Sequence, residues 1–355
     1  MDDASVASNG RWLFSTSQLE QTPTSLDRSV HEEMYDRARG VEFLFRVGSH
    51  INMHLPGMFT AATWFHRFYM RYSMDDYHRQ NVAASCIFLA TKTEECGRKL
   101  RDVAKVVCAK VHNNSMDSVS DGKEVDEISR AILMTEEVLL EALCFDFVVD
   151  SPHFDLVSLF ETYEVPQAVQ DHALSIANDS YRTPLCVLYM PKTIAAACYI
   201  LAHRLVDGPH SLSLDARVFP TLATASLPTP PTHQSNSPNA SKAAVEFFRL
   251  DAADGQDVID AMDILIEFYR HTDYQGLVDY LSDIILIEPP SNPSPRPSLY
   301  KQAPQSSQHA MQVSTVVNSG HATPESLHGS GTPFPMRTKT FGLDEDAGPG
   351  QLDLS

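Results

Sequence analysis

The chain has 355 residues, 43% of them hydrophobic, and a formal net charge of −19 at pH 7. This length suits two domains of ordinary size, and the composition can fill their hydrophobic cores, which excludes a wholly disordered protein. Proteins that bind nucleic acid use Lys and Arg to replace the counterions of phosphates. The acidic charge therefore argues against direct nucleic-acid binding.

The cysteines and the first residues predict a soluble protein of a reducing compartment. The six cysteines form no CxxC pair, and most lie in apolar helical runs: Cys86, Cys96, Cys108, Cys144, Cys186 and Cys198. We expect buried, reduced thiols rather than disulfides or zinc ligands. The opening MDDASVASNG is acidic and polar, unlike a signal peptide, and no apolar run has the length of a membrane span.

After an N-terminal segment, residues 1–30, residues 31–148 are predicted to form a first helical bundle. Apolar residues recur there with the period of a helix, and little of the sequence alternates as a strand would. The fold class is therefore predicted to be all-α. Five helices are expected, over residues 34–47, 58–70, 82–95, 100–111 and 125–144.

Residues 149–287 are predicted to form a second bundle. It opens at Ser151-Pro152, since proline is favoured in the first turn of a helix. Residues 207–241 and 288–355 are rich in Pro and Ser, so we expect a disordered insertion and a disordered tail. The remaining apolar runs predict helices over residues 154–163, 167–181, 192–205, 243–250, 258–271 and 277–287.

One apolar helix occurs in each half of the chain. Residues 82–90, VAASCIFLA, align with residues 194–202, IAAACYILA, at a constant offset of 112 residues, since 194 − 82 = 112. A helix that is hydrophobic all round must be wrapped by other helices. Each copy is also the third helix of its series, so we interpret the two bundles as a duplication around two central helices.

The sequence contains no recognisable catalytic, metal or cofactor motif. Phosphate-binding loops, HExxH, GxSxG and CxxC are missing, and the 15 histidines have no metal-ligand spacing. His50 and His54 are expected at the surface, and His66 in a core or an interface. No nucleophile, base and orienting group occur together. We therefore expect a protein that is not an enzyme by itself and needs no cofactor.

Glu136 is the residue that departs from the pattern of its helix. On a helical wheel, Glu127, Arg130, Glu137 and Glu141 share one side, whereas Glu136 falls among apolar residues on the other. A carboxylate there is costly unless it is paired. Lys92, which closes the apolar run of residues 82–90, is the expected partner. The pair either satisfies both charges within the chain or also binds another protein, and the residues alone favour the first interpretation.

Several motifs resemble the cyclin family. HRFYMRYS (66–73), AASCIFLATKTEE (83–95) and LLEALCFDF (139–147) are similar to the first cyclin box, and the repeat is similar to the second. RWLFSTSQLEQTPTSLDR (11–28) resembles the start of transcriptional cyclins of the K/T type. Residues 178–205 resemble both the K type and cyclin C. The resemblance implies two tandem five-helix cyclin boxes.

The resemblance also implies a function as the regulatory subunit of a cyclin-dependent kinase. Lys92 and Glu136 match the cyclin residues that hold the kinase loop before its αC helix, and Glu95 ends the same A-x-K-x-E-E motif. Phe145 and Phe147 match apolar residues that pack against αC. This match makes a binding role for Lys92 and Glu136 the preferred interpretation. A K/T-type cyclin implies a nuclear kinase complex that phosphorylates the RNA polymerase II C-terminal domain and promotes elongation.

Two departures and two alternatives accompany this interpretation. The MRAIL motif is replaced by YDRARGVEFLF, and the insertion at residues 207–241 is longer than expected. A cyclin C-like Mediator subunit is one alternative. A general transcription factor of the TFIIB type is another, but the charge and the missing CxxC pairs argue against it. Five residues precede proline in flexible segments, where they are either kinase targets or merely neighbours of rigid prolines: Thr229, Ser237, Ser294, Thr323 and Thr332.

Overall fold

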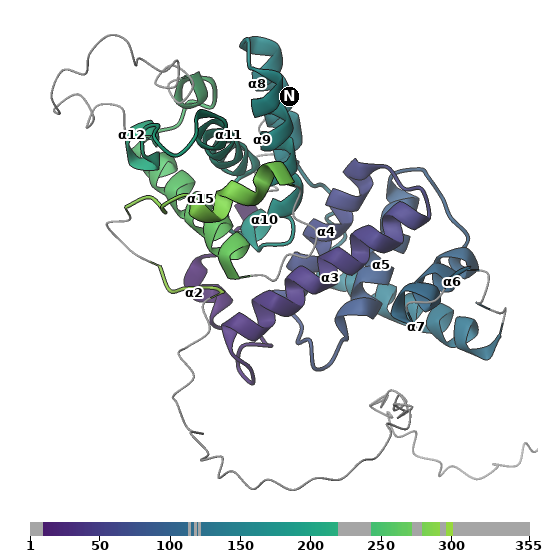
Figure 1. The fold of residues 1–355 in the computed structure, drawn as a ribbon. Helices are drawn as coiled ribbons and strands as arrows, with labels where there is room; N and C mark the ends of the chain where they lie inside the picture. The colour runs from purple at the N-terminus through teal and green to yellow at the C-terminus, as the bar shows by residue number, and fades with distance from the viewer. Residues whose placement is uncertain are drawn as a thin grey trace, which may run out of the picture. The chain divides into compact units, whose positions relative to one another are not determined.

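The computed structural model describes residues 10–112, 115–116, 119, 122–218, 243–271, 279–291 and 296–300 (Figure 1). Within these ranges all regular secondary structure is helical, which confirms the predicted all-α class. The five predicted phosphorylation sites lie outside the described residues. No helix in the described ranges is both long and apolar enough to cross a membrane.

The first bundle is built around one buried helix. α5 contacts each of the four other helices, and its residues 82–91 are buried. The entry to the first helix is fixed by a capping box, in which Ser29 and Glu32 satisfy each other's backbone amides. The bundle comprises α3 (Val30–His50), α4 (Leu55–Tyr69), α5 (Arg79–Thr93), α6 (Leu100–Val111) and α7 (Lys123–Ala142).

The second bundle repeats this plan. α11 is its central helix: residues 193–203 are buried, and it contacts α8, α9 and α15. Both copies of the predicted repeat are thus the wrapped helices of their bundles. Residues 243–247 are also helical. The elements are α8 (Pro152–Thr162), α9 (Gln167–Ser180), α10 (Leu185–Leu188), α11 (Pro191–Asp207), α12 (Leu214–Val218), α15 (Ala252–His271) and the 3-10 helix η4 (Asp279–Leu286).

Two segments that we expected to be disordered contain ordered residues. The insertion was predicted to start at residue 207, but α12 lies within it, and Arg217 is buried there, 2.9 Å from the Asp207 carboxylate. The tail was predicted to start at residue 288, but residues 296–300 lie on α15. Arg296 contacts Glu267 at 2.7 Å, and the Tyr300 amide donates to the same carboxylate at 2.9 Å. The helical period does not reveal such isolated ionic contacts.

The N-terminal segment joins the two bundles. It forms the short helices η1 (Gly10–Trp12) and α2 (Thr16–Leu19), and the Phe14 amide donates to the Val187 carbonyl at 2.8 Å. Leu19 is fully buried in the same apolar cluster as the second bundle. The segment is therefore part of the folded unit.

The six cysteines are free thiols, but the prediction that they are buried holds for only three of them. Cys86, Cys108 and Cys198 are buried, whereas Cys144 is exposed at the end of α7. The sequence placed Cys144 at the end of an apolar run, and the turn that follows α7 carries it to the surface.

Candidate functional site

Lys92 and Glu136 form an ion pair at the edge of the first bundle. The ammonium Nζ lies 2.6 Å from Oε1 and 2.8 Å from Oε2 of the carboxylate. The Glu136 side chain is only 9% exposed, whereas the Lys92 side chain is 48% exposed. The predicted contact between these two residues is confirmed, and its cation faces the solvent.

The ends of two helices position the pair. Lys92 lies in the last turn of α5, where a cation is favoured by the partial negative charge of the carbonyl end. The same ammonium lies 4.1 Å from the centre of the Phe88 ring, which adds a cation–π contact. Glu136 lies on the buried face of α7 beside Ile132 and Leu139, as the helical wheel predicted.

The charged pair can accept further partners. A carboxylate oxygen has two lone pairs, and an ammonium group has three protons, so neither group is saturated by one pairing. Glu137, the next residue along α7, points instead into solvent. The pair is therefore the one place on this part of α7 where a buried carboxylate and an accessible cation lie side by side.

Apolar side chains are exposed on the same helix. Leu133, about one turn before Glu136, is 47% exposed, and Met134, on the opposite side of α7 from Glu136, is 63% exposed. Residues three apart on a helix are neighbours on its surface, so Leu133 adjoins the pair. Neither residue was a predicted site residue, because a helical wheel predicts burial and does not say which apolar positions remain uncovered.

Phe145 and Phe147 belong to a turn at the end of α7. Cys144 and Phe145 adopt left-handed backbone angles, with φ of 50° and 56°, and the Phe145 amide donates to the Leu140 carbonyl at 3.2 Å. The Phe145 ring is thereby turned outward and is 65% exposed. Phe147 faces inward, with its ring 5.8 Å from that of Trp64. The two predicted site residues thus differ in exposure, although their rings contact each other.

The N-terminal segment holds this turn in place. The Trp12 indole donates to Asp146 at 3.1 Å, and the guanidinium of Arg67 lies 4.9 Å from the centre of the indole ring. Burial lowers the pKa of Arg67 to about 10, which still leaves it charged at neutral pH. Arg67 also donates to the Val148 carbonyl at 3.2 Å. These contacts fix the backbone on both sides of Phe147.

Glu95 lies just beyond α5. Its φ of 53° is in the left-handed region, and its side chain is exposed. The preceding Glu94 caps α5 and accepts a hydrogen bond from the Thr60 hydroxyl at 3.2 Å. Of the predicted site residues, the structure thus brings together Lys92 and Glu136. Glu95 lies three residues after Lys92. Phe145 lies beyond Ala142, the last residue of α7, which is about 9 Å from Glu136 along the helix axis.

Comparison with known proteins assigns the first bundle to a family. Residues 12–148 match the model of the cyclin N-terminal domain. Cyclin pch1 of Schizosaccharomyces pombe is 42% identical over 196 residues, which cover 54% of this chain and 57% of that protein. Residues 12–148 are a cyclin N-terminal domain, and the chain is a relative of the K- and T-type cyclins.

The other relatives agree with this assignment. Human cyclin-K is 30% identical over 55% of this chain and 33% of its own length, and human cyclin-T2 is 27% identical over 59% and 29%. The chain matches little more than half of cyclin pch1 and less of these two proteins. A chain of the yeast RNA Pol II CTD kinase CTDK-1 complex aligns over 84% of the present chain and 86% of its own length, at 16% identity. Its TM-score is 0.46, a likeness too distant to inform function.

Proposed function

We propose that this chain is the non-catalytic regulatory subunit of a transcriptional cyclin-dependent kinase. The kinase would phosphorylate the RNA polymerase II C-terminal domain in the nucleus and promote elongation. The observation that carries the proposal is the Lys92–Glu136 pair, a buried carboxylate beside an accessible cation, flanked by exposed apolar side chains. The K- and T-type relatives favour this role over that of a cyclin C-like Mediator subunit.

The proposed docking surface consists of Lys92, Glu95, Leu133, Glu136 and Phe145. Its charged centre supplies a hydrogen-bond donor and an acceptor to backbone groups of a kinase loop. The outward Phe145 ring supplies apolar area, and exposed aromatic residues are common anchors of protein interfaces. The Phe147 ring packs edge-on against the Phe145 ring, with 6.3 Å between their centres.

Activation follows from the chemistry of protein kinases. Phosphoryl transfer requires an ion pair between a strand lysine and the αC glutamate of the kinase. A kinase whose αC swings outward loses that pair. A cyclin that binds only the inward state shifts the population by its difference in affinity for the two states. The cyclin contributes binding energy in this scheme, and the kinase contributes every reacting group.

Binding of the kinase by a Glu136→Ala variant tests the proposal. Affinity purification of the tagged chain and mass spectrometry first identify the kinase, and a titration of purified kinase then measures Kd. Glu136→Ala removes the acceptor at the centre of the surface, and we expect a loss of about 2 kcal/mol or more, roughly thirtyfold in Kd. Phosphorylation of a C-terminal-domain peptide should fall in parallel at limiting cyclin.

Glu137→Ala is the matched control, since it removes the same group one position further along α7, on the solvent side. It should leave Kd within about twofold, as expected for a surface substitution. Circular dichroism and thermal unfolding must show that both variants are folded. Equal losses in the two variants, or a purified chain that brings down no kinase, would reject the proposed surface.

A further inference from the structure

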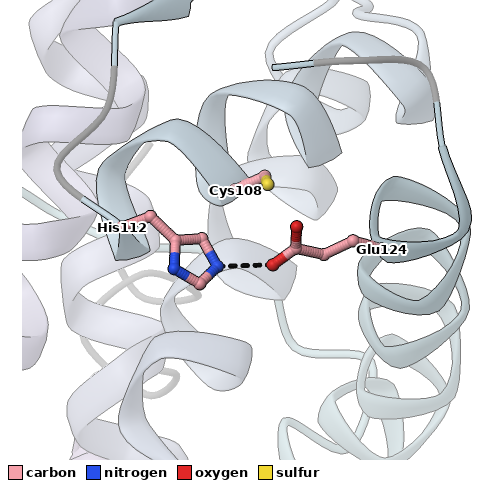
Figure 2. A group of neighbouring side chains, drawn as sticks. All are labelled: Cys108, His112 and Glu124. Atoms are coloured by element: carbon pink, nitrogen blue, oxygen red, sulfur yellow. Dashed lines mark hydrogen bonds and ion pairs between the residues drawn. The ribbon is translucent and has the colours of Figure 1, made fainter. Parts of the chain in front are cut away.

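Three side chains with metal-binding atoms meet where α6 ends and α7 begins (Figure 2). On α7 this place is 12 residues before Glu136, since 136 − 124 = 12. Cys108 lies in the last turns of α6, and His112 caps the same helix one turn later. Glu124 lies in the first turn of α7. The thiol sulfur, a ring nitrogen and a carboxylate oxygen all lie within 4.8 Å of one another.

The three side chains point toward one another from two helices (Figure 2). His112 Nε2 and a Glu124 oxygen are already in hydrogen-bond contact. Cys108 is 4% exposed and faces the bundle, whereas the side chains of His112 and Glu124 are exposed at the rim. The arrangement combines a sulfur ligand fixed by the core with two ligands that an ion can reach from solvent.

We propose that Cys108, His112 and Glu124 bind one zinc ion, with water as the fourth ligand. A thiolate, an imidazole and a carboxylate are the ligand types that Zn²⁺ takes, whereas Mg²⁺ and Ca²⁺ prefer oxygen alone. Bonds of about 2.0–2.3 Å in a tetrahedral site put its ligand atoms roughly 3.3–3.8 Å apart. The ion would therefore draw the sulfur inward and separate the imidazole from the carboxylate, which are changes of side-chain rotamer.

The site would tie the two helices together. His112 ends α6 and Glu124 begins α7, the helix that carries Glu136 at its other end. A metal bound to both residues would lower the entropic cost of closing the loop between the helices. Because it binds only the folded arrangement, it would also stabilise the first bundle. Without an ion, burial and the neighbouring Glu124 carboxylate raise the pKa of the Cys108 thiol, and metal binding would displace that proton.

Cobalt and zinc titrations of the full chain test this site. The protein is freed of metal with a chelator and titrated with Co²⁺. We expect one equivalent to bind, with the visible absorption of a tetrahedral ion and a thiolate-to-cobalt charge-transfer band, both removed by Zn²⁺. Zinc should also raise the unfolding temperature of the chain. His112→Gln and Glu124→Gln should each weaken Co²⁺ binding at least tenfold, since even the loss of a residue that only hydrogen-bonds to a metal ligand lowers metal affinity about 10–100-fold.

Cys108→Ser should abolish the charge-transfer band and the thermal shift. Cys96→Ser and His172→Gln, which change the same residue types elsewhere, are the matched controls and should leave both signals intact. If Cys108→Ser fails to fold, the rim variant His112→Gln decides the question, because its side chain is exposed. A cobalt complex without a thiolate band, or equal affinity in His112→Gln and the wild type, would overturn the proposal and leave a simple His112–Glu124 contact.

Discussion

At the scale of the residue, the two members of the central ion pair have unequal surroundings. Glu136 is almost wholly buried, whereas about half of the Lys92 side chain reaches solvent. A buried charge that loses its partner keeps its desolvation cost, but an exposed one is hydrated. The carboxylate therefore depends on the cation more than the cation depends on the carboxylate.

This asymmetry predicts unequal effects on the stability of the free chain. Lys92→Met should cost about 1–3 kcal/mol of unfolding free energy, because it leaves a buried carboxylate without its cation. Glu136→Gln should cost less than about 1 kcal/mol, because Lys92 can turn to water. Urea unfolding followed by circular dichroism measures both values. A larger loss in Glu136→Gln would contradict the described burial.

At the scale of the element, close helix packing depends on small residues that periodicity alone does not single out. Gly40 in α3 faces the fully buried Phe65 ring of α4, and a Cβ atom at Gly40 would overlap that ring. Phe65 is enclosed by other aromatic rings, including Tyr69 at 5.0 Å between centroids. The ring has little room to move aside.

Gly40→Ala is accordingly predicted to destabilise the first bundle. Overpacking lowers the free energy of unfolding by about 1–3 kcal/mol, whereas the higher helix propensity of Ala raises it by at most about 1 kcal/mol. Gly97→Ala is the control, since nothing lies within 4 Å of a Cβ there, and it should change stability by less than about 0.5 kcal/mol. Chemical unfolding of both variants checks the difference, and a stabilised Gly40→Ala variant would contradict it.

The helices that position the site were predictable because their signals are local. The spacing of Ile132, Glu136 and Leu139 placed the carboxylate on the buried face of α7, and the order of the bundles followed from the repeat. The remaining features depend on partners distant in sequence. Arg217 and Arg296 are held by carboxylates on other elements, and Glu124 meets the Cys-x3-His spacing of α6 from another helix. Phe145 turns outward because of backbone angles that its side chain does not encode.

At the scale of the whole molecule, a buried polar network connects the bundles. His66 is fully buried in α4, and its Nε2 donates to the Tyr181 carbonyl at the end of α9, at 2.8 Å. Its Nδ1 accepts from Arg37 at 3.4 Å, and Arg37 pairs with Glu33 at 2.6 Å. Burial, followed by the charge of Arg37, lowers the pKa of His66 to about 3. The histidine is therefore neutral in the folded state.

Acid should weaken the connection between the bundles. Because the folded pKa of His66 lies below the unfolded value, its contribution is complete above about pH 6.5 and is lost as pH falls toward 3. Below about pH 6.5 the free energy of unfolding falls by about 1.4 kcal/mol per pH unit, which amounts to about 2 kcal/mol at pH 5. Urea unfolding at about pH 7.5 and pH 5 measures it. His66→Gln, which retains a donor for Tyr181, should flatten this dependence, and an unchanged slope in that variant would contradict the assignment.

Residues 296–300, which lie on α15, also determine where a shortened chain can end without loss of packing. A fragment that stops at residue 287, where the apolar pattern ends, would remove Arg296 from Asp263 and Glu267 and take the buried Leu299 and Tyr300 from the second bundle. Acidic groups on one helix would then lose a cation that they share. A recombinant fragment intended to keep the second bundle intact should therefore include Tyr300.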